Sequence, residues 1–112
     1  MPVADLYNVP TTPEQLAKWS FSHLANHRDQ AEAVQRLYGL SVPVYVIDPL
    51  DPKNASTFLY QHQIMHNTND AITGVSGYDL TDVDLSDPEQ MASWILLNAQ
   101  LHFAEAQVLG TW

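Results

Sequence analysis

The chain contains no cysteine, which excludes disulfides, thiolate nucleophiles and cysteine-ligated metal sites. It has only four glycines, and they do not form a phosphate-binding loop. No apolar run approaches the roughly 20 residues that a membrane-spanning helix needs, and the N-terminus has neither the basic start nor the apolar core of a signal peptide. We therefore expect a soluble protein with no membrane partner, in a compartment that the missing cysteines do not define.

Basic residues are also scarce. Four Lys and Arg residues face 13 Asp and Glu residues, which gives a net charge of −9. A protein with this charge is repelled by phosphate backbones, so we expect no nucleic-acid partner. The length of 112 residues and the hydrophobic content of 46% predict a single domain, 1–112, with one core.

The same pattern of residue types occurs three times, each time after a proline: Pro13, Pro52 and Pro88. The sixth residue after the proline is aromatic, the tenth is histidine or asparagine, the fourteenth is histidine, and the seventeenth is an amide or glutamate. At these offsets stand Trp19, Phe58 and Trp94; His23, His62 and Asn98; His27, His66 and His102; and Gln30, Asn69 and Glu105. This agreement predicts an internal repeat of helical segments.

The repeat predicts an all-α domain of three principal helices joined by long ordered connectors. A capping residue before each proline marks the helix start, and a glycine marks its end. The helices are expected at about 12–38, 51–73 and 87–109, and they end at Gly39, Gly74 and Gly110. Residues 1–11 are expected to form an extended N-terminal arm, and residues 42–47 of the first connector an extended stretch.

The second connector contains alternating acidic residues that look like calcium ligands. Asp82, Asp84 and Ser86 match the first positions of an EF-hand loop. Asp87 replaces the glycine of that loop, and Ser93 replaces its bidentate glutamate, so the motif fails. The stretch fits better as an acidic loop whose last residues, Ser86 and Asp87, cap the third helix.

The repeated polar positions fall on the apolar face of each predicted helix. At 100° per residue, offsets ten, fourteen and seventeen lie within about 60° of one another. In the first helix this face also carries Leu16, Trp19, Val34 and Leu37. We therefore expect a buried polar layer near the middle of the domain, with parallel and antiparallel helices both possible. Its members are His23, His27, His62, His66, His102 and Glu105, with Gln30, Asn69 and Asn98 as network partners.

The polar groups of this layer need partners, because an unpaired buried polar group costs about 1–3 kcal/mol. Three interpretations of how they find them remain open. The layer could be a hydrogen-bonded network that fixes the helix register, or a polar face that packs on another copy or another protein. It could also bind metal. Its two HxxxH pairs each place two imidazoles one helical turn apart, and His102 and Glu105 would complete a nitrogen-rich site for zinc, iron or copper.

The ligand set of this metal interpretation, two HxxxH pairs with His102 and Glu105, resembles the histidine-rich di-iron centre of hemerythrin-like bundles. The chain departs from that family in having three long helices where the family has four, and few acids at the matching positions. His102 and Glu105 could act as an acid and base pair, but no serine or threonine has a recognisable nucleophile setting. No complete catalytic motif is present, so we expect a protein that is not an enzyme.

Three short segments resemble small uncharacterised proteins encoded by tailed bacteriophages. They are YQHQIMHN at 60–67, GYDLTDV at 77–83 and SWILLN at 93–98. The resemblance implies a structural or assembly protein of the phage particle, located in the virion or the host cytoplasm, which self-associates or docks on a larger complex. It implies no functional residue. The alternative function is a metal-binding helical bundle with redox or hydrolytic activity.

Overall fold

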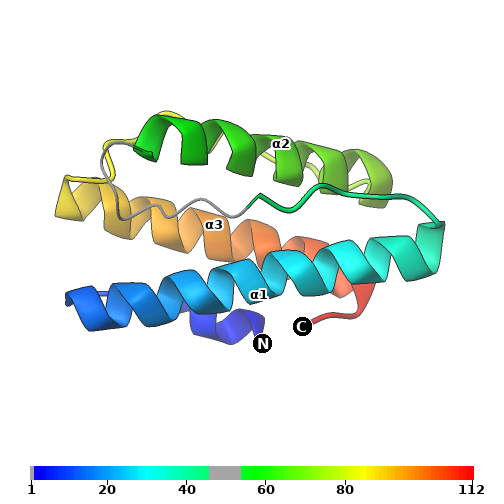
Figure 1. Ribbon diagram of the computed structural model, residues 1–112, viewed down its shortest axis with the longest axis horizontal. Helices are drawn as coiled ribbons and strands as arrows, with labels where there is room; N and C mark the ends of the chain where they lie inside the picture. The colour runs from blue at the N-terminus through cyan, green and yellow to red at the C-terminus, as the bar shows by residue number, and fades with distance from the viewer. Residues whose placement is uncertain (1, 46–53) are drawn as a thin grey trace.

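The computed structural model describes residues 2–45 and 54–112. This part of the chain contains three α-helices, α1 (Pro13–Tyr38), α2 (Ala55–Thr73) and α3 (Pro88–Leu109), and a short 3-10 helix, η1 (Val3–Tyr7). It contains no strand. The prediction of an all-α domain with three principal helices is confirmed (Figure 1).

The helix ends follow from local chemistry. The Thr12 side chain accepts a hydrogen bond from the backbone N–H of Gln15 at the start of α1, and Asp87 caps α3 in the same way. All three helices end at a glycine with positive φ, namely Gly39, Gly74 and Gly110. The role predicted for Ser86 as a cap is wrong, because its hydroxyl donates to Asp84. The predicted start of the second helix at 51–52 lies outside the described residues.

The three long helices run in the same direction, which settles the topology that the sequence left open (Figure 1). The second connector runs back along the bundle from the end of α2 to the start of α3, and residues 39–45 run back from the end of α1. Parallel neighbours need connectors that span a whole helix. A 19-residue α2 is about 28 Å long, and about 13 extended residues cover that distance.

The N-terminal segment differs from the extended arm that was predicted. Val3–Tyr7 form η1, which contacts both α1 and α3. Val3 and Leu6 are both buried, and the indole Nε1 of Trp19 donates to the Leu6 carbonyl oxygen at 3.1 Å. An extended chain would point residues three apart to opposite faces, whereas one helical turn brings both into the core.

The core has two apolar clusters with the polar layer between them. Near the helix N-termini, the repeated aromatics pack together: the ring centroids of Trp19 and of Phe58 both lie 5.9 Å from that of Trp94. A smaller cluster farther along the helices joins Ala33 and Val34 to Leu109. Leu37 was predicted to face the core but is 53% exposed, since it lies in the last turn of α1, beyond this cluster. None of the described helices is long and apolar enough to cross a membrane.

Candidate metal centre

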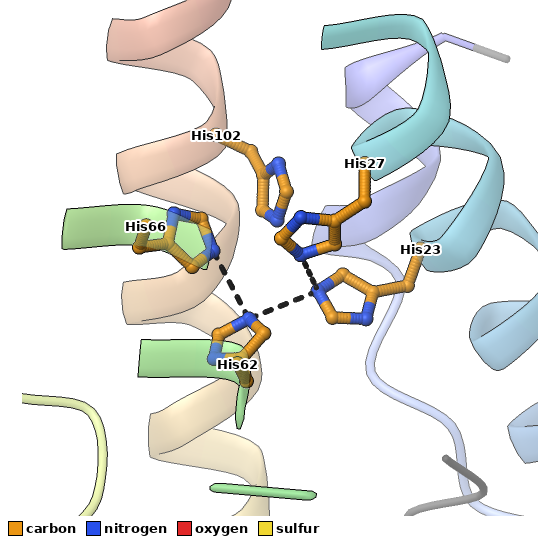
Figure 2. Close-up of side chains that lie close together, drawn as sticks. All are labelled: His23, His27, His62, His66 and His102. Carbon is orange, nitrogen blue, oxygen red and sulfur yellow. Dashed lines mark hydrogen bonds between the residues drawn. The ribbon is translucent and has the colours of Figure 1, made fainter. Parts of the chain in front are cut away.

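All five histidines meet at one point inside the bundle (Figure 2). None is more than 4% exposed, and one ligand atom from each lies within 4.8 Å of the others. Helix α1 contributes two of them, α2 two and α3 one. Because the helices run parallel, residues at equal offsets from the three prolines reach the same level of the bundle.

Four Nε2 atoms form a chain of short contacts (Figure 2). The Nε2 of His23 lies 3.1 Å from that of His27 and 3.2 Å from that of His62, and the Nε2 of His62 lies 3.0 Å from that of His66. A ring nitrogen carries one N–H or one lone pair in the ring plane, so it makes one well-directed hydrogen bond. His23 and His62 each have two such neighbours at Nε2. Hydrogen bonds among the imidazoles therefore cannot satisfy all three contacts.

The same distances suit ligands of one metal ion. With metal–nitrogen bonds of 2.0–2.1 Å, neighbouring nitrogens lie about 2.9–3.4 Å apart in octahedral or tetrahedral geometry. The three observed separations, 3.0–3.2 Å, fall in this interval. The widest separation in the group, 4.8 Å, exceeds the ~4.2 Å between opposite ligands by only about 0.6 Å. Side-chain shifts of about this size would bring all five nitrogens to one ion.

Gln30 fixes the orientation of His102. The Gln30 Nε2 donates to the backbone carbonyl of His102 at 3.1 Å, so the Gln30 Oε1, 3.2 Å from His102 Nδ1, must be an acceptor. The Nδ1 of His102 then carries the proton, and its Nε2 carries a lone pair. That Nε2 is buried and has no hydrogen-bond partner in the described protein. A fixed tautomer with a bare nitrogen is what a metal ligand requires.

Glu105 holds a second imidazole in the same way. Its Oε2 lies 2.9 Å from Nδ1 of His66, and both side chains are fully buried. When Oε2 accepts the Nδ1 proton, the Nε2 of His66 is free to bind a cation. The sequence suggested Glu105 as a ligand, but the structure places its carboxylate behind His66 and outside the group of converging ligand atoms.

Burial keeps the imidazoles neutral. Burial, and then the positive charge that His66 would carry, lowers the pKa of His23 to about 3. Burial likewise lowers the pKa of His66 to about 4. The pKa values of His27, His62 and His102 also fall well below the usual value, first because of burial and then because neighbouring imidazoles would repel a charge. Neutral imidazoles have the lone pairs that metal binding needs.

A second carboxyl group, which the sequence analysis missed, lies beyond Glu105. Burial and the nearby Glu105 carboxyl raise the pKa of Asp70 to about 8, and burial raises that of Glu105 to about 8. Two interacting carboxyl groups with raised pKa values retain at least one proton near neutral pH. Asp70 stands one helical turn after His66 on α2, and this spacing was the signal in the sequence.

Gly77 makes room for the Asp70 carboxyl group. A Cβ atom at residue 77 would overlap Asp70 Oδ2. We expect Gly77→Ala to lower the free energy of unfolding by about 1–2 kcal/mol, because the Asp70 side chain must leave its place. The same substitution in an Asp70→Ala background should cost less than about 0.5 kcal/mol. Urea unfolding of the four proteins measures the difference, and equal costs in both backgrounds would contradict this account.

The structure places all nine residues of the predicted polar layer in the interior. Asn98 lies beside His23, His62 and His66, although neither its amide nitrogen nor its amide oxygen makes a well-directed hydrogen bond. Asn69 is buried with an unpaired Oδ1. The candidate centre therefore comprises the five imidazoles, oriented by Gln30 and Glu105.

The acidic loop has a simpler role than calcium binding. The Asp79 carboxylate accepts hydrogen bonds from the backbone N–H and hydroxyl of Thr81, and Asp84 does the same for Ser86. Each aspartate thus closes a local turn, as expected for a loop that leads into α3.

Comparison with protein-family models, curated proteins and solved structures gives no match. The resemblance of three segments to tailed-phage proteins stays a prediction, and the geometry of the site carries the functional argument.

Proposed function

We propose that the protein binds one transition-metal ion at the five-histidine centre. The observation that carries this proposal is the convergence of five buried, neutral imidazoles with three short nitrogen contacts that hydrogen bonds cannot all satisfy. A cation replaces those unsatisfied contacts with coordination bonds. The bare Nε2 of His102, fixed by Gln30, supports the same conclusion.

The donor set favours particular metals. Imidazole nitrogens prefer zinc, copper, iron and nickel, while magnesium and calcium prefer oxygen ligands. Five protein ligands around one ion leave at most one position of an octahedral shell for another molecule. Catalytic zinc sites usually have three protein ligands and an open position. The centre is therefore better suited to holding a metal than to catalysing hydrolysis.

A hydrogen-bonded network that only fixes helix register explains the centre less well. Such a network would need alternating donors and acceptors, whereas His23 and His62 each contact two nitrogens through one Nε2. It would also leave Nε2 of His102 buried without a partner, a cost of about 1–3 kcal/mol.

The test is elemental analysis of untagged protein, produced in metal-supplemented medium and purified without chelators. We expect about one zinc, copper, iron or nickel ion per chain. A His27→Ala, His66→Ala double variant should retain less than about a tenth of this, as long as its helical circular dichroism is preserved. Asn26→Ala is the matched control, because Asn26 is buried next to His27 but its amide donates only to the Ser22 carbonyl. A wild-type protein that is empty and does not bind these ions in titration would disprove the proposal.

A second candidate function is that of a structural or assembly protein, such as a phage particle component, that self-associates or docks on a larger complex. It is favoured by the surface of α3, which exposes Leu96, Leu97, Phe103 and Val108. Apolar side chains on one helix are typical of association surfaces. Sedimentation of the samples used for elemental analysis tests this function. A strictly monomeric protein at high concentration would contradict self-association.

A further inference from the structure

A pocket of about 530 Å³ lies near the N-terminal ends of the three long helices. Its walls come from the first turns of α1, α2 and α3 and from residues 81 and 83–86 of the second connector, and they include Trp19 and Trp94. This volume is within the ~300–1,000 Å³ typical of small-molecule sites. It lies apart from the five histidines, none of which lines it.

The two indoles present carbon surfaces to this pocket. The Nε1 of Trp19 donates to the Leu6 carbonyl at 3.1 Å, and that of Trp94 donates to the Leu80 carbonyl at 2.8 Å. Each indole has a single N–H, so neither can donate to a ligand. Leu59 contributes further apolar surface from α2.

Charge restricts what can enter. Among the residues that the structure describes, Asp84 is the only charged one that lines the pocket, and its hydrogen bonds from Ser86 lower the pKa of its carboxyl group, which keeps it ionised. The whole chain has a net charge of −9. No basic side chain within residues 2–45 and 54–112 lines the pocket to neutralise an anion, so anionic ligands such as fatty acids are disfavoured.

We propose that this pocket binds an uncharged, largely apolar small molecule, which packs against Trp19 and Trp94. Flat ring systems fit the two indoles best, since aromatic rings gain from stacked or edge-to-face contact beyond the burial of their area. The proposal does not depend on metal binding.

The location of the pocket gives its occupant a direct structural link to the histidine centre. The ring of Trp19 stacks on His23 with centroids 4.6 Å apart, and the ring of Trp94 lies 5.2 Å from that of His62. The two indoles thus form part of the wall of both sites. A molecule in the pocket would be separated from the imidazoles by a single aromatic layer.

The test uses a pair of dyes that differ in one charged group. N-phenyl-1-naphthylamine is uncharged and apolar, and 8-anilino-1-naphthalenesulfonate is the same ring system with a sulfonate. We expect the uncharged dye to bind saturably with a Kd on the order of 10–100 µM, and to quench the emission of Trp19 and Trp94 by energy transfer. The sulfonated dye should bind at least about tenfold more weakly. Equal affinity for both dyes, or no saturable binding of the uncharged dye, would overturn the proposal.

Variants locate the binding site. Ala55 lines the pocket, whereas Ala71 is exposed farther along the same helix. Ala55→Phe should fill the pocket and raise the Kd of the uncharged dye at least about tenfold, while Ala71→Phe should change it less than about twofold. Ser56→Phe, at an exposed position of the lining, serves as a second filling variant if Ala55→Phe does not fold. Equal effects of the pocket-filling and control substitutions would show that the dye binds elsewhere.

Discussion

Acidification of the metal-free protein from pH 7.5 to pH 5.5 should lower its free energy of unfolding by roughly 2 kcal/mol, because the five histidines cost about 7 kcal/mol and Asp70 and Glu105 return about 5 kcal/mol. This is a measurable part of the ~5–15 kcal/mol typical of a domain, and the loss occurs below pH 6.5, where the unfolded histidines take up protons. The cause is that all five histidines are neutral in the folded protein and become charged when it unfolds.

The sign follows from the pKa values. The pKa of His23 is lowered to about 3 and that of His66 to about 4 in the folded state, against 6.5 in the unfolded state. Below pH 6.5 the unfolded chain therefore binds more protons, and each histidine costs about 1.4 kcal/mol per pH unit. The stabilisation that comes from the neutral histidines is therefore full above pH 6.5 and is lost as the pH falls below it. Asp70 and Glu105 act in the opposite direction, because the pKa of each is raised to about 8 and the folded state gains protons first.

Urea unfolding followed by circular dichroism at several pH values measures this dependence. The His27→Ala, His66→Ala double variant has two fewer buried imidazoles, so its stability should fall less steeply below pH 6.5, by about 2–3 kcal/mol per pH unit. An equal pH dependence of the wild type and the double variant below pH 6.5 would show that the imidazoles are not held neutral by burial.

The sequence was sufficient to predict the helices and the inward-facing polar positions. Residue periodicity defines the angle at which each side chain leaves a helix, and this alone placed His23, His27, His62, His66 and His102 on apolar faces. Proline and glycine signals then located the starts of α1 and α3 and the ends of all three helices to within a residue, because those signals act on the local backbone.

Features that depend on neighbouring helices could not be predicted. Periodicity gives no information on helix direction, so the parallel arrangement came only from the structure. The bond that fixes the tautomer of His102 joins it to Gln30, 72 residues away, and the pairing of His66 with Glu105 spans 39 residues. Gln30 and Glu105 were identified from the sequence as members of a polar layer, but the histidine that each one contacts depends on how α1, α2 and α3 pack.

The N-terminal segment shows the same limit. An extended arm was expected for residues 1–11, which contain Pro2 and Pro10, but burial of Val3 and Leu6 between α1 and α3 favours one turn of 3-10 helix instead. Local propensity is a weak signal over five residues, and the apolar contact with the bundle outweighs it.

Saturation with zinc or copper should raise the melting temperature of the chelator-treated protein by roughly 20 °C at neutral pH. An ion that binds only the folded state stabilises it by RT ln(1 + [L]/Kd), which is about 4 kcal/mol at 1,000 times the Kd. For a domain of this size each kcal/mol shifts the melting temperature by about 4–8 °C. The bound ion also removes the cost of leaving Nε2 of His102 without a partner.

Thermal unfolding followed by circular dichroism, with and without the ion, measures this shift. Magnesium should have no effect, since it prefers oxygen ligands. Asn26→Ala should melt at a lower temperature than the wild type but show the same metal-dependent shift, because its side chain bonds only within α1. Removal of His27 and His66 should abolish the shift. A shift of equal size in that double variant would mean that the metal binds outside the five-histidine centre, whatever the metal content of the purified protein.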